Sequence, residues 1–235
     1  MVAATLILLL VASFLFWRFV WFLRDPPRSV PEGADKIVSA ADGYVTYVTP
    51  VAGKEIPMAI KNRTRIPLDE LTALPEQVAQ SGVLIGVYMT ETSVHRNRAP
   101  VAGEVVLRRH RQAADTNRSL ARMTANLVLG RMPYETGCDY LVENERLTIA
   151  LRTDAGHLVS VTQIADKWID RIVADVEPGD RLERGAQYGL IRFGSQCDVF
   201  LPDALIRRVN VSPGQYVYAG ETVIAEANIP TQPSA

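Results

Sequence analysis

The chain has 235 residues, 48% of them hydrophobic and 22% charged, which predicts a folded domain with an appendage and excludes a disordered chain. Lys and Arg (25) nearly balance Asp and Glu (26), and the resulting net charge of −1 argues against a protein whose main role is to bind nucleic acid. The two cysteines, Cys138 and Cys197, make neither a disulfide framework nor a paired zinc-ligand spacing, and no metal site is predicted.

Residues 1–23 predict a membrane anchor. The run up to Trp17 has no charged side chain, and after Arg18 it resumes as far as Leu23. About 20 helical residues cross the hydrocarbon core, and an arginine near the end of the span can reach the headgroups. A cleaved signal peptide is the alternative, but it lacks a preceding positive charge and small residues for cleavage. Because arginines follow the span and none precedes it, we expect a cell (inner) membrane protein with residues 24–235 on the cytoplasmic face.

After the anchor the sequence predicts a mainly β domain of the α+β class, with few helices. Short runs of β-branched and aromatic residues bounded by Gly and Pro are typical of strands. Examples are residues 43–48, 103–107 and 147–151. Segments 177–185 and 212–220 both read Pro-Gly-polar-x-aliphatic-x-x-Gly, which predicts a turn, a short strand and a second turn in each. This pattern resembles the hairpins of lipoyl- and biotinyl-carrier domains, so a β-sandwich or barrel-like fold is expected. Carrier function is disfavoured because no Met-Lys pair occurs.

Helical patterns are fewer. Residues 68–80 have apolar residues at helical spacing, interrupted by Pro75. Residues 164–173 carry an apolar stripe that predicts an amphipathic helical segment, packed on the core or, alternatively, against a membrane. Six arginines between residues 108 and 131 are typical of a solvated loop or face or, alternatively, of contact with anionic lipid headgroups.

Few residues are candidates for chemistry. His95 follows an apolar run and precedes a Pro turn, where a side chain can face a cleft. Taken alone, His95, Ser195 and Asp42 are each more often structural residues than functional ones. Ser195 is not part of a G-x-S-x-G elbow, and no phosphate-binding glycine motif is found.

Four motifs taken together resemble phosphatidylserine decarboxylase proenzymes of the short prokaryotic type. They are FLRDPPRSVP at residues 22–31, VSAADGYV at 38–45, VHRNRAPVAG at 94–103 and IRFGS at 191–195, with a further N-E-R element at 144–146. Their order along the chain is that of the family. Three positions depart from the family pattern: Ala40 replaces a proline, Ser93 stands where aspartate is common, and Arg98 stands where longer members have a second histidine.

The resemblance implies pyruvoyl-dependent decarboxylation of phosphatidylserine to phosphatidylethanolamine and CO2 in phospholipid biosynthesis. An amino acid loses CO2 readily only when the electrons left on Cα have a sink, and a pyruvoyl group is one. It would arise from Ser195, whose hydroxyl attacks the Gly194 carbonyl in an autocatalytic cleavage. The products would be a 1–194 β chain and a 195–235 α chain that form a heterodimer. His95, oriented by Asp42 as in a serine-protease triad, is the expected base and later the proton donor to Cα.

Arg96 and Arg98 are weaker candidates for binding the substrate's carboxylate or phosphate, and strand alternation would place them on one face, opposite Asn97. The expected partners are phosphatidylserine and anionic membrane lipid, without nucleic acid, and a homo-oligomer is left open. Two alternatives remain. The first is a pyruvoyl decarboxylase for another amine, which would not need an anchor. The second is a non-enzymatic membrane-anchored β module, against which the intact set of Asp42, His95 and Gly194-Ser195 argues.

Overall fold

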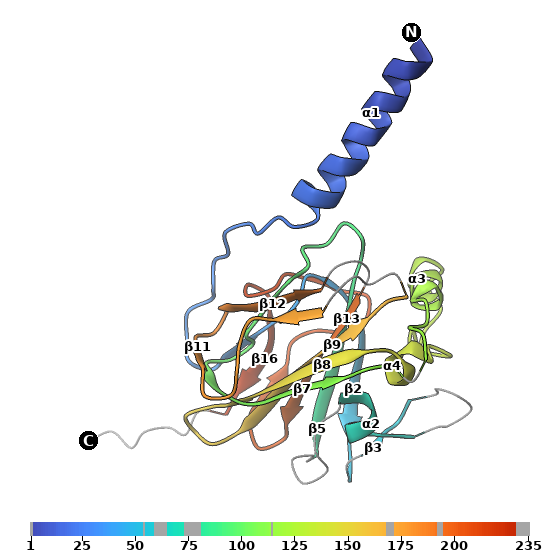
Figure 1. The fold of residues 1–235 in the computed structure, drawn as a ribbon. Helices are drawn as coiled ribbons and strands as arrows, with labels where there is room; N and C mark the ends of the chain where they lie inside the picture. Colours follow the sequence, from blue (N-terminus) through green and yellow to red (C-terminus); the bar gives the residue numbers. More distant parts are fainter. Residues whose placement is uncertain are drawn as a thin grey trace.

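A long N-terminal helix projects away from a β domain (Figure 1). The computed structural model describes residues 2–53, 55–58, 65–72, 81–113, 115–167, 172–191 and 195–228. Helix α1 (Val2–Phe16) continues into a π-helical turn, η1 (Trp17–Trp21). Together they form a helix of 20 residues with a mean hydropathy of 2.2, and none of it is buried against the domain. It is long and apolar enough to cross a membrane, which supports the predicted anchor.

Eight antiparallel strands form the main sheet, in the order β11-β7-β8-β9-β13-β5-β2-β15, and the sheet curls into a half-barrel. The strands are β2 (Gly43–Val51), β5 (Gly82–Met89), β7 (Gly103–Arg111), β8 (Arg146–Arg152), β9 (Leu158–Ala165), β11 (Arg181–Leu182), β13 (Ser195–Pro202) and β15 (Tyr216–Val217). The strands predicted at 43–48, 103–107 and 147–151 lie within β2, β7 and β8, so these predictions are confirmed.

Smaller sheets and short helices complete the described part. One sheet joins β1 (Lys36–Val38), β16 (Val223–Ala227) and β14 (Ile206–Val209). A second joins β10 (Ile172–Ala174), β12 (Gln187–Ile191) and β6 (Arg96–Arg98), and a third pairs β3 (Glu55–Ile56) with β4 (Ile66–Pro67). The helices are α2 (Leu68–Thr72), α3 (Ala121–Val128) and α4 (Tyr140–Glu143).

The main sheet has a hydrophobic core on each face, because successive side chains of a strand point to opposite sides. On one face Cys197 and Val199 of β13 pack with residues of the two three-stranded sheets, including Ile37 and Ile191. On the other face Phe200 packs with residues of α2, α3 and α4. The helices and the two-stranded sheet therefore cover one face and the two three-stranded sheets the other, which confirms a mainly β fold with few helices.

The two Pro-Gly segments that echo each other supply both edges of the main sheet. β11 pairs with β7 at one edge, and β15 pairs with β2 at the other. Each short strand lies between turns whose glycines have positive φ: Gly179 (+103°) and Gly185 (+79°) in one, Gly214 (+90°) and Gly220 (+76°) in the other. The predicted turn, short strand and turn are confirmed in both copies, while the likeness to carrier-domain hairpins stays a prediction.

The helical segment predicted over residues 164–173 is wrong where the structure describes it. Ile164 lies near the end of β9 and packs in the core beside the helices, whereas Ile172 begins β10 and packs in the opposite core. The apolar residues at helical spacing therefore belong partly to the end of β9 and partly to the start of β10. Residues 168–171 lie outside the described residues, as do 73–80 of the other predicted helix, of which α2 is the described part. The six arginines of the arginine-rich stretch are all exposed, as a solvated loop or face requires, but they are divided between the end of β7, helix α3 and the connections beside that helix.

Arg146 of the N-E-R element ties α2 and α4 to the sheet. Its side chain is fully buried and donates hydrogen bonds of 2.7–3.1 Å to the carbonyls of Glu70, Leu71, Leu141 and Asn144. Burial lowers the pKa of Arg146 to about 10, so the group remains charged at neutral pH. Carbonyl dipoles therefore solvate this charge inside the protein.

We expect Arg146→Lys to lower the free energy of unfolding by about 3 kcal/mol or more, because lysine cannot reach all of these buried carbonyls and leaves some without a donor. Urea denaturation of the full-length protein in detergent, in a Ser195→Ala background that keeps the chain in one piece, measures the change. Arg109→Lys, at an exposed position of β7, is the matched control and should change stability by less than about 0.5 kcal/mol. Equal effects of the two substitutions would contradict the assigned role of Arg146.

Candidate active site

Ser195 is the first residue of β13, which lies inside the main sheet. It is fully buried and lies in register with Met89 at the end of β5 and Ala165 at the end of β9. Its Oγ donates a hydrogen bond of 3.2 Å to Met89 Sδ, which is a weak acceptor. The predicted cleavage partner, Gly194, lies outside the described residues. The serine hydroxyl is therefore held in the interior by a weak contact.

His95 is buried and neutral. Its side-chain Nδ1 lies 2.9 Å from the backbone carbonyl oxygen of Ser93, and the residue is 2% exposed. A carbonyl oxygen only accepts, so Nδ1 carries the proton and Nε2 is the unprotonated nitrogen. Burial lowers the pKa of His95 to about 3; the bond to Ser93 acts in the opposite direction and the charge of Arg24 lowers it further. Among the described residues, the buried Nε2 has no hydrogen-bond partner. The site therefore contains an unprotonated nitrogen whose lone pair accepts no hydrogen bond from them.

Asp42 does not form the expected hydrogen bond to His95. Its carboxylate accepts two bonds from Arg28, at 2.8 and 3.0 Å, and a third from the backbone N–H of Ala219 at 2.7 Å. Arg28 also donates to Glu221 at 3.2 Å. One terminal nitrogen of the Arg28 guanidinium donates to both oxygens of Asp42 and the other donates to Glu221, so a permanent charge holds the carboxylate. The triad geometry is therefore not formed, and the Ser93 carbonyl occupies the place predicted for Asp42.

Residues 22–31, which form the first motif and are called the strap below, contact this site directly. The Phe22 side chain is fully buried, and its ring stacks on the His95 imidazole with 4.0 Å between centroids. Arg24 donates to the carbonyl of Thr92 at 2.6 Å. The strap thus covers His95 and is bonded to the loop that carries it.

Arg96 and Arg98 share one face of β6, as predicted, but have different partners. Both are half-buried, while Asn97 between them is fully buried. Arg98 forms an ion pair of 2.6 Å with Asp25 of the strap. The Nε of Arg96 is buried and has no hydrogen-bond partner among the described residues. When the side-chain amide of Gln187 is oriented to donate to Asp25, its oxygen accepts a hydrogen bond of 2.8 Å from Arg96. Arg96 therefore keeps more hydrogen-bonding capacity for an anion than Arg98 does.

The third and fourth motifs meet beside Ser195. Asn97 lies 3.8 Å from Met89 Sδ, the same atom that Ser195 contacts. The backbone N–H of Ile191 donates to the carbonyl of His95 at 3.1 Å. Ile191 and Ser195 are four residues apart and so at most about 14 Å from each other. The segment that would be cleaved therefore begins next to His95.

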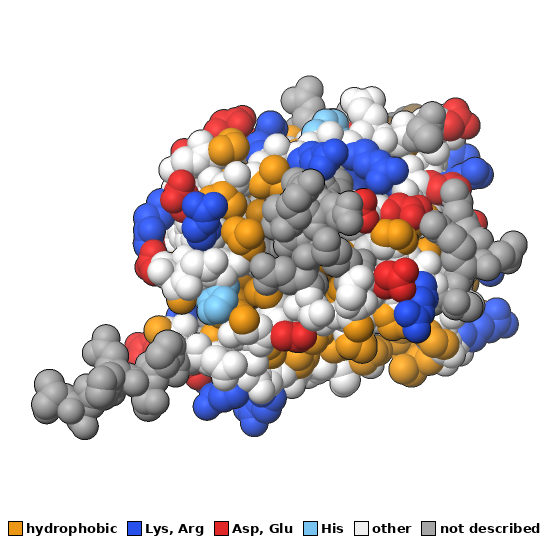
Figure 2. All heavy atoms as spheres, turned by 90° about the horizontal axis from the view of Figure 1, so that it is seen from below, with side chains coloured by type: hydrophobic (Ala, Val, Ile, Leu, Met, Phe, Trp, Pro, Cys, Tyr) orange, Lys and Arg blue, Asp and Glu red, His pale blue; other side chains and the backbone are white. Residues whose placement is uncertain are grey.

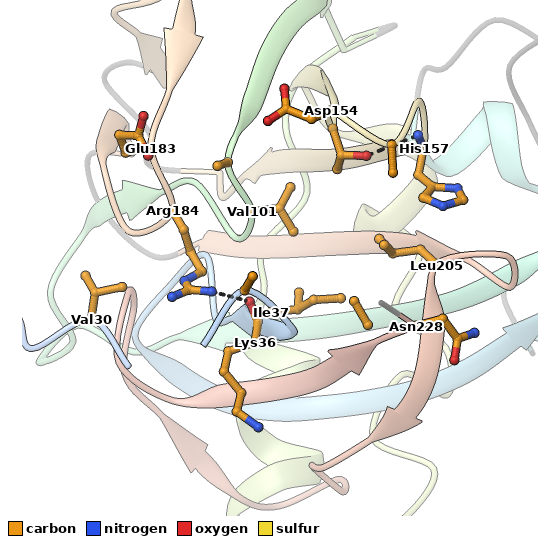
Figure 3. Close-up of a pocket in the computed structure, with 15 residues that line it drawn as sticks. Val30, Lys36, Ile37, Val101, Asp154, His157, Glu183, Arg184, Leu205 and Asn228 are labelled. Carbon is orange, nitrogen blue, oxygen red and sulfur yellow. Dashed lines mark hydrogen bonds between the residues drawn. The ribbon is translucent and has the colours of Figure 1, made fainter. Parts of the chain in front are cut away.

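A groove of about 760 Å³ lies elsewhere on the domain (Figure 3). Arg184 crosses it and donates to the backbone carbonyl of Lys36 at 3.0 Å. The residues that line it do not include Asp42, His95 or Ser195. The groove borders the strap through Val30 and the third motif through Val101 and Ala102, but it is separate from the three predicted catalytic side chains.

The contributions of Phe22 and Arg28 are missing from the sequence prediction. Both stand in the first motif, whose ordered match to the family was the available signal. Neither residue type suggests a reaction, and their partners His95 and Asp42 lie in other motifs. The role of the Ser93 carbonyl is also missing from the sequence prediction, because every residue has a backbone carbonyl and the residue type does not show which one will bind a side chain.

Comparison with known proteins decides the family. A family model described as phosphatidylserine decarboxylase matches residues 15–225. The chain belongs to the phosphatidylserine decarboxylase family. The match covers the strap, the loop of His95 and all of β13, so the resemblance carried by the motifs is confirmed.

Curated relatives of this decarboxylase family cover nearly the whole chain. A phosphatidylserine decarboxylase proenzyme of Aromatoleum aromaticum is 36% identical over 212 residues, which are 90% of this chain and 80% of the relative. One of Nitrosomonas europaea is 34% identical over 215 residues, 90% and 81% of the two chains. One of Symbiobacterium thermophilum is 33% identical over 234 residues, 95% and 90% of the two chains.

The buried pair of Arg28 and Asp42 predicts a large effect of Asp42→Asn. The two side chains are 6% and 3% exposed, so the substitution leaves the guanidinium charge buried and only partly compensated. We expect the free energy of unfolding to fall by about 3 kcal/mol, measured by urea denaturation. Glu221→Gln is the matched control: Glu221 is 33% exposed and should contribute less than about 1 kcal/mol. A loss no greater for Asp42→Asn than for the control would contradict this ranking.

Proposed function

We propose that this chain is a self-cleaving, pyruvoyl-dependent decarboxylase that converts phosphatidylserine to phosphatidylethanolamine and CO2 in phospholipid biosynthesis. The observation that carries the proposal is the neutral His95, with Nε2 unpartnered, in the same cluster of family motifs as the buried Ser195. Family membership supports the decarboxylase activity, and relatives named as proenzymes support a processing step.

Self-cleavage starts with attack of Ser195 Oγ on the Gly194 carbonyl carbon. Serine is a weak nucleophile and needs a base, and His95 Nε2 takes the hydroxyl proton. The amide C–N bond then breaks and its nitrogen receives that proton, which leaves an ester on Oγ and an amine at residue 195. Removal of the α-proton of residue 195 expels the Gly194 carboxylate and leaves dehydroalanine. Its imine tautomer reacts with water to give the pyruvoyl ketone and ammonia. The 1–194 and 195–235 chains stay paired through strands of shared sheets.

The surroundings of Ser195 fit a pyruvoyl group. Formation of the group would remove Oγ together with the Gly194 carboxylate, turn Cβ into a methyl group and place the ketone on Cα, so the side chain would lose only its weak bond to Met89. The group supplies a sink for the electrons that remain on Cα when CO2 leaves. His95 then holds and delivers the proton to Cα. Arg96, with its unpartnered Nε, is better placed than Arg98 to bind the substrate's carboxylate or phosphate.

A second surface supports contact with anionic lipid at the membrane. At the end of α3, Val128, Leu129 and Met132 are 76%, 58% and 63% exposed, and Arg122 and Arg131 are close to them in the chain. Apolar tips beside positive charges suit the interface of an anionic membrane. The face turned away from α1 instead mixes charges of both signs (Figure 2). We therefore place the domain on the cytoplasmic surface of the cell (inner) membrane, held by α1 and oriented by this tip.

The cleavage is tested by the intact mass of the purified protein. Wild-type protein should appear as two chains, the smaller beginning at position 195 and resisting Edman degradation because a pyruvoyl end has no amine. Ser195→Ala removes the nucleophile and should give one uncleaved, inactive chain. Ser160→Ala, which changes a buried serine on the neighbouring strand β9, is the control and should cleave normally. An active, full-length wild-type protein with unmodified Ser195 would refute the mechanism.

The role of His95 predicts a particular pH dependence. His95→Ala should abolish self-cleavage and decarboxylation, whereas His110→Ala, at an exposed residue paired with Glu145, should leave both intact. Because the pKa of His95 is lowered to about 3, below its ordinary value of 6.5, the imidazole stays unprotonated as the pH falls. The cleavage rate should therefore show no inflection from this histidine between about pH 8 and about pH 5. Normal cleavage by His95→Ala would require another base.

A further inference from the structure

We propose that Phe22, the residue that directly follows the membrane helix, is a positioning residue for His95, so that the membrane anchor ends on the catalytic base. The inference rests on the proposed function of His95. It assigns Phe22 an effect on the reaction itself, in addition to any part in membrane attachment.

Two contacts together fix the orientation of the imidazole. The Phe22 and His95 rings are stacked, with 4.0 Å between centroids and 26° between planes. This contact restricts tilting of the imidazole, and the bond from Nδ1 to the Ser93 carbonyl restricts its rotation about the Cβ–Cγ bond. Without Phe22 the hydrogen bond alone would leave the ring free to tilt, and Nε2 would move with it.

Phe22 also keeps water from one face of the imidazole. Phe22 is 0% exposed and His95 is 2% exposed, so the stacked faces are closed to solvent. Among the described residues, the groups that shift the pKa of His95 are the guanidinium of Arg24 on the strap and the backbone carbonyl of Ser93, and neither provides a carboxylate that would favour an imidazolium. By excluding water, Phe22 thus helps to keep the imidazole of His95 unprotonated.

The same residue belongs to the end of the membrane helix. The backbone N–H of Phe22 donates to the carbonyl of Trp17 at 2.9 Å, which closes the π-helical turn. Arg24 then clamps the helix end to the domain: it donates to the Trp21 carbonyl at 2.9 Å, covers the Trp21 ring at 4.3 Å and donates to the Thr92 carbonyl at 2.6 Å. A headgroup at the membrane surface therefore lies close to the catalytic site without the lipid having to leave the bilayer.

Neighbouring positions of the turn provide a matched control. Phe19 is 61% exposed, whereas Phe22, three residues further on, is fully buried. Both are phenylalanines in or next to η1, and both contribute to the apolar character of the segment. Only Phe22 stacks on His95 among the described aromatic contacts. Loss of membrane affinity would affect both positions, whereas loss of imidazole positioning affects only one.

The test compares Phe22→Ala, Phe22→Leu and Phe19→Ala in the full-length protein, in vesicles that contain phosphatidylserine. We expect Phe22→Ala to lower kcat and the self-cleavage rate roughly 10- to 100-fold while KM and vesicle binding stay unchanged. Phe22→Leu keeps the site apolar but cannot stack, and should lose about threefold or more. Phe19→Ala should match the wild type in all four measurements.

A spectroscopic measurement separates positioning from a general loss of structure. In the uncleaved Ser195→Ala background, histidine NMR signals are followed against pH, and the His95 signal is identified by its absence in His95→Gln. His95 should not titrate above about pH 5 in the parent, and Phe22→Ala should bring its titration toward the ordinary range near pH 6.5. In the protein that retains Ser195, Phe22→Ala should also make the cleavage rate fall as the pH drops through the same range.

Wild-type kcat and an unchanged His95 titration in Phe22→Ala would overturn the proposal. If Phe22→Ala does not fold, Phe22→Leu decides: a lower kcat at unchanged KM supports positioning, and wild-type kcat overturns it. Full activity of His95→Gln is a different outcome, since it would refute the proposed role of His95 whatever Phe22 does. Equal losses in Phe19→Ala and Phe22→Ala would assign both residues to membrane contact and overturn positioning.

Discussion

The pairing of β13 with strands on both sides is the constraint on which the site depends. All eight of its residues are buried, all eight pair with β5, and six pair with β9. A serine in such a strand can be approached only where the strand begins. Ser195 is that first residue, and β5 ends beside it at Met89. The loop from Thr90 to His95 follows directly, so a short connection links β5 to the residue that we propose as the base.

Most charged groups of the motifs bind one another, and few are left for the reaction. Arg28 is bound by Asp42 and Glu221, while Asp25 is bound by Arg98. Buried ion pairs of this kind add little net stability, but removing one partner is costly, so they favour a single arrangement of the strap. This explains how a polar, proline-rich segment can lie in a defined position over an apolar site. It also leaves the neutral His95 as the base that we propose for the reaction.

Local pattern was sufficient for some elements, and long-range pairing decided the others. The strand containing residues 43–48 and the turns at Gly179 and Gly214 follow from side-chain type and glycine conformation, which act within a few residues. Residues 164–173 could not be assigned this way, because Ile164 and Ile172 belong to strands whose partners are distant in the chain. In the site, motif order predicted Ser195 and His95, and the structure brings their motifs together through the pairing of Ile191 with His95. The partner of Asp42 could not be predicted, because any of several groups could have met its carboxylate and only the folded strap brings Arg28 to it.

The strands that follow residue 194 are interlaced with those that precede it. β13 lies between β5 and β9, β15 lies on β2, and β16 pairs with β1 in a different sheet. If the chain is cut ahead of β13, the two resulting chains share strands of the same sheets. They could separate only if these sheets unfolded. Once parted, they have lost the covalent link that kept the later strands at high local concentration around their partners. If the proposed cleavage occurs, the protein must fold beforehand as a single chain, and the working lifetime of the cleaved form would be set by how slowly it unfolds.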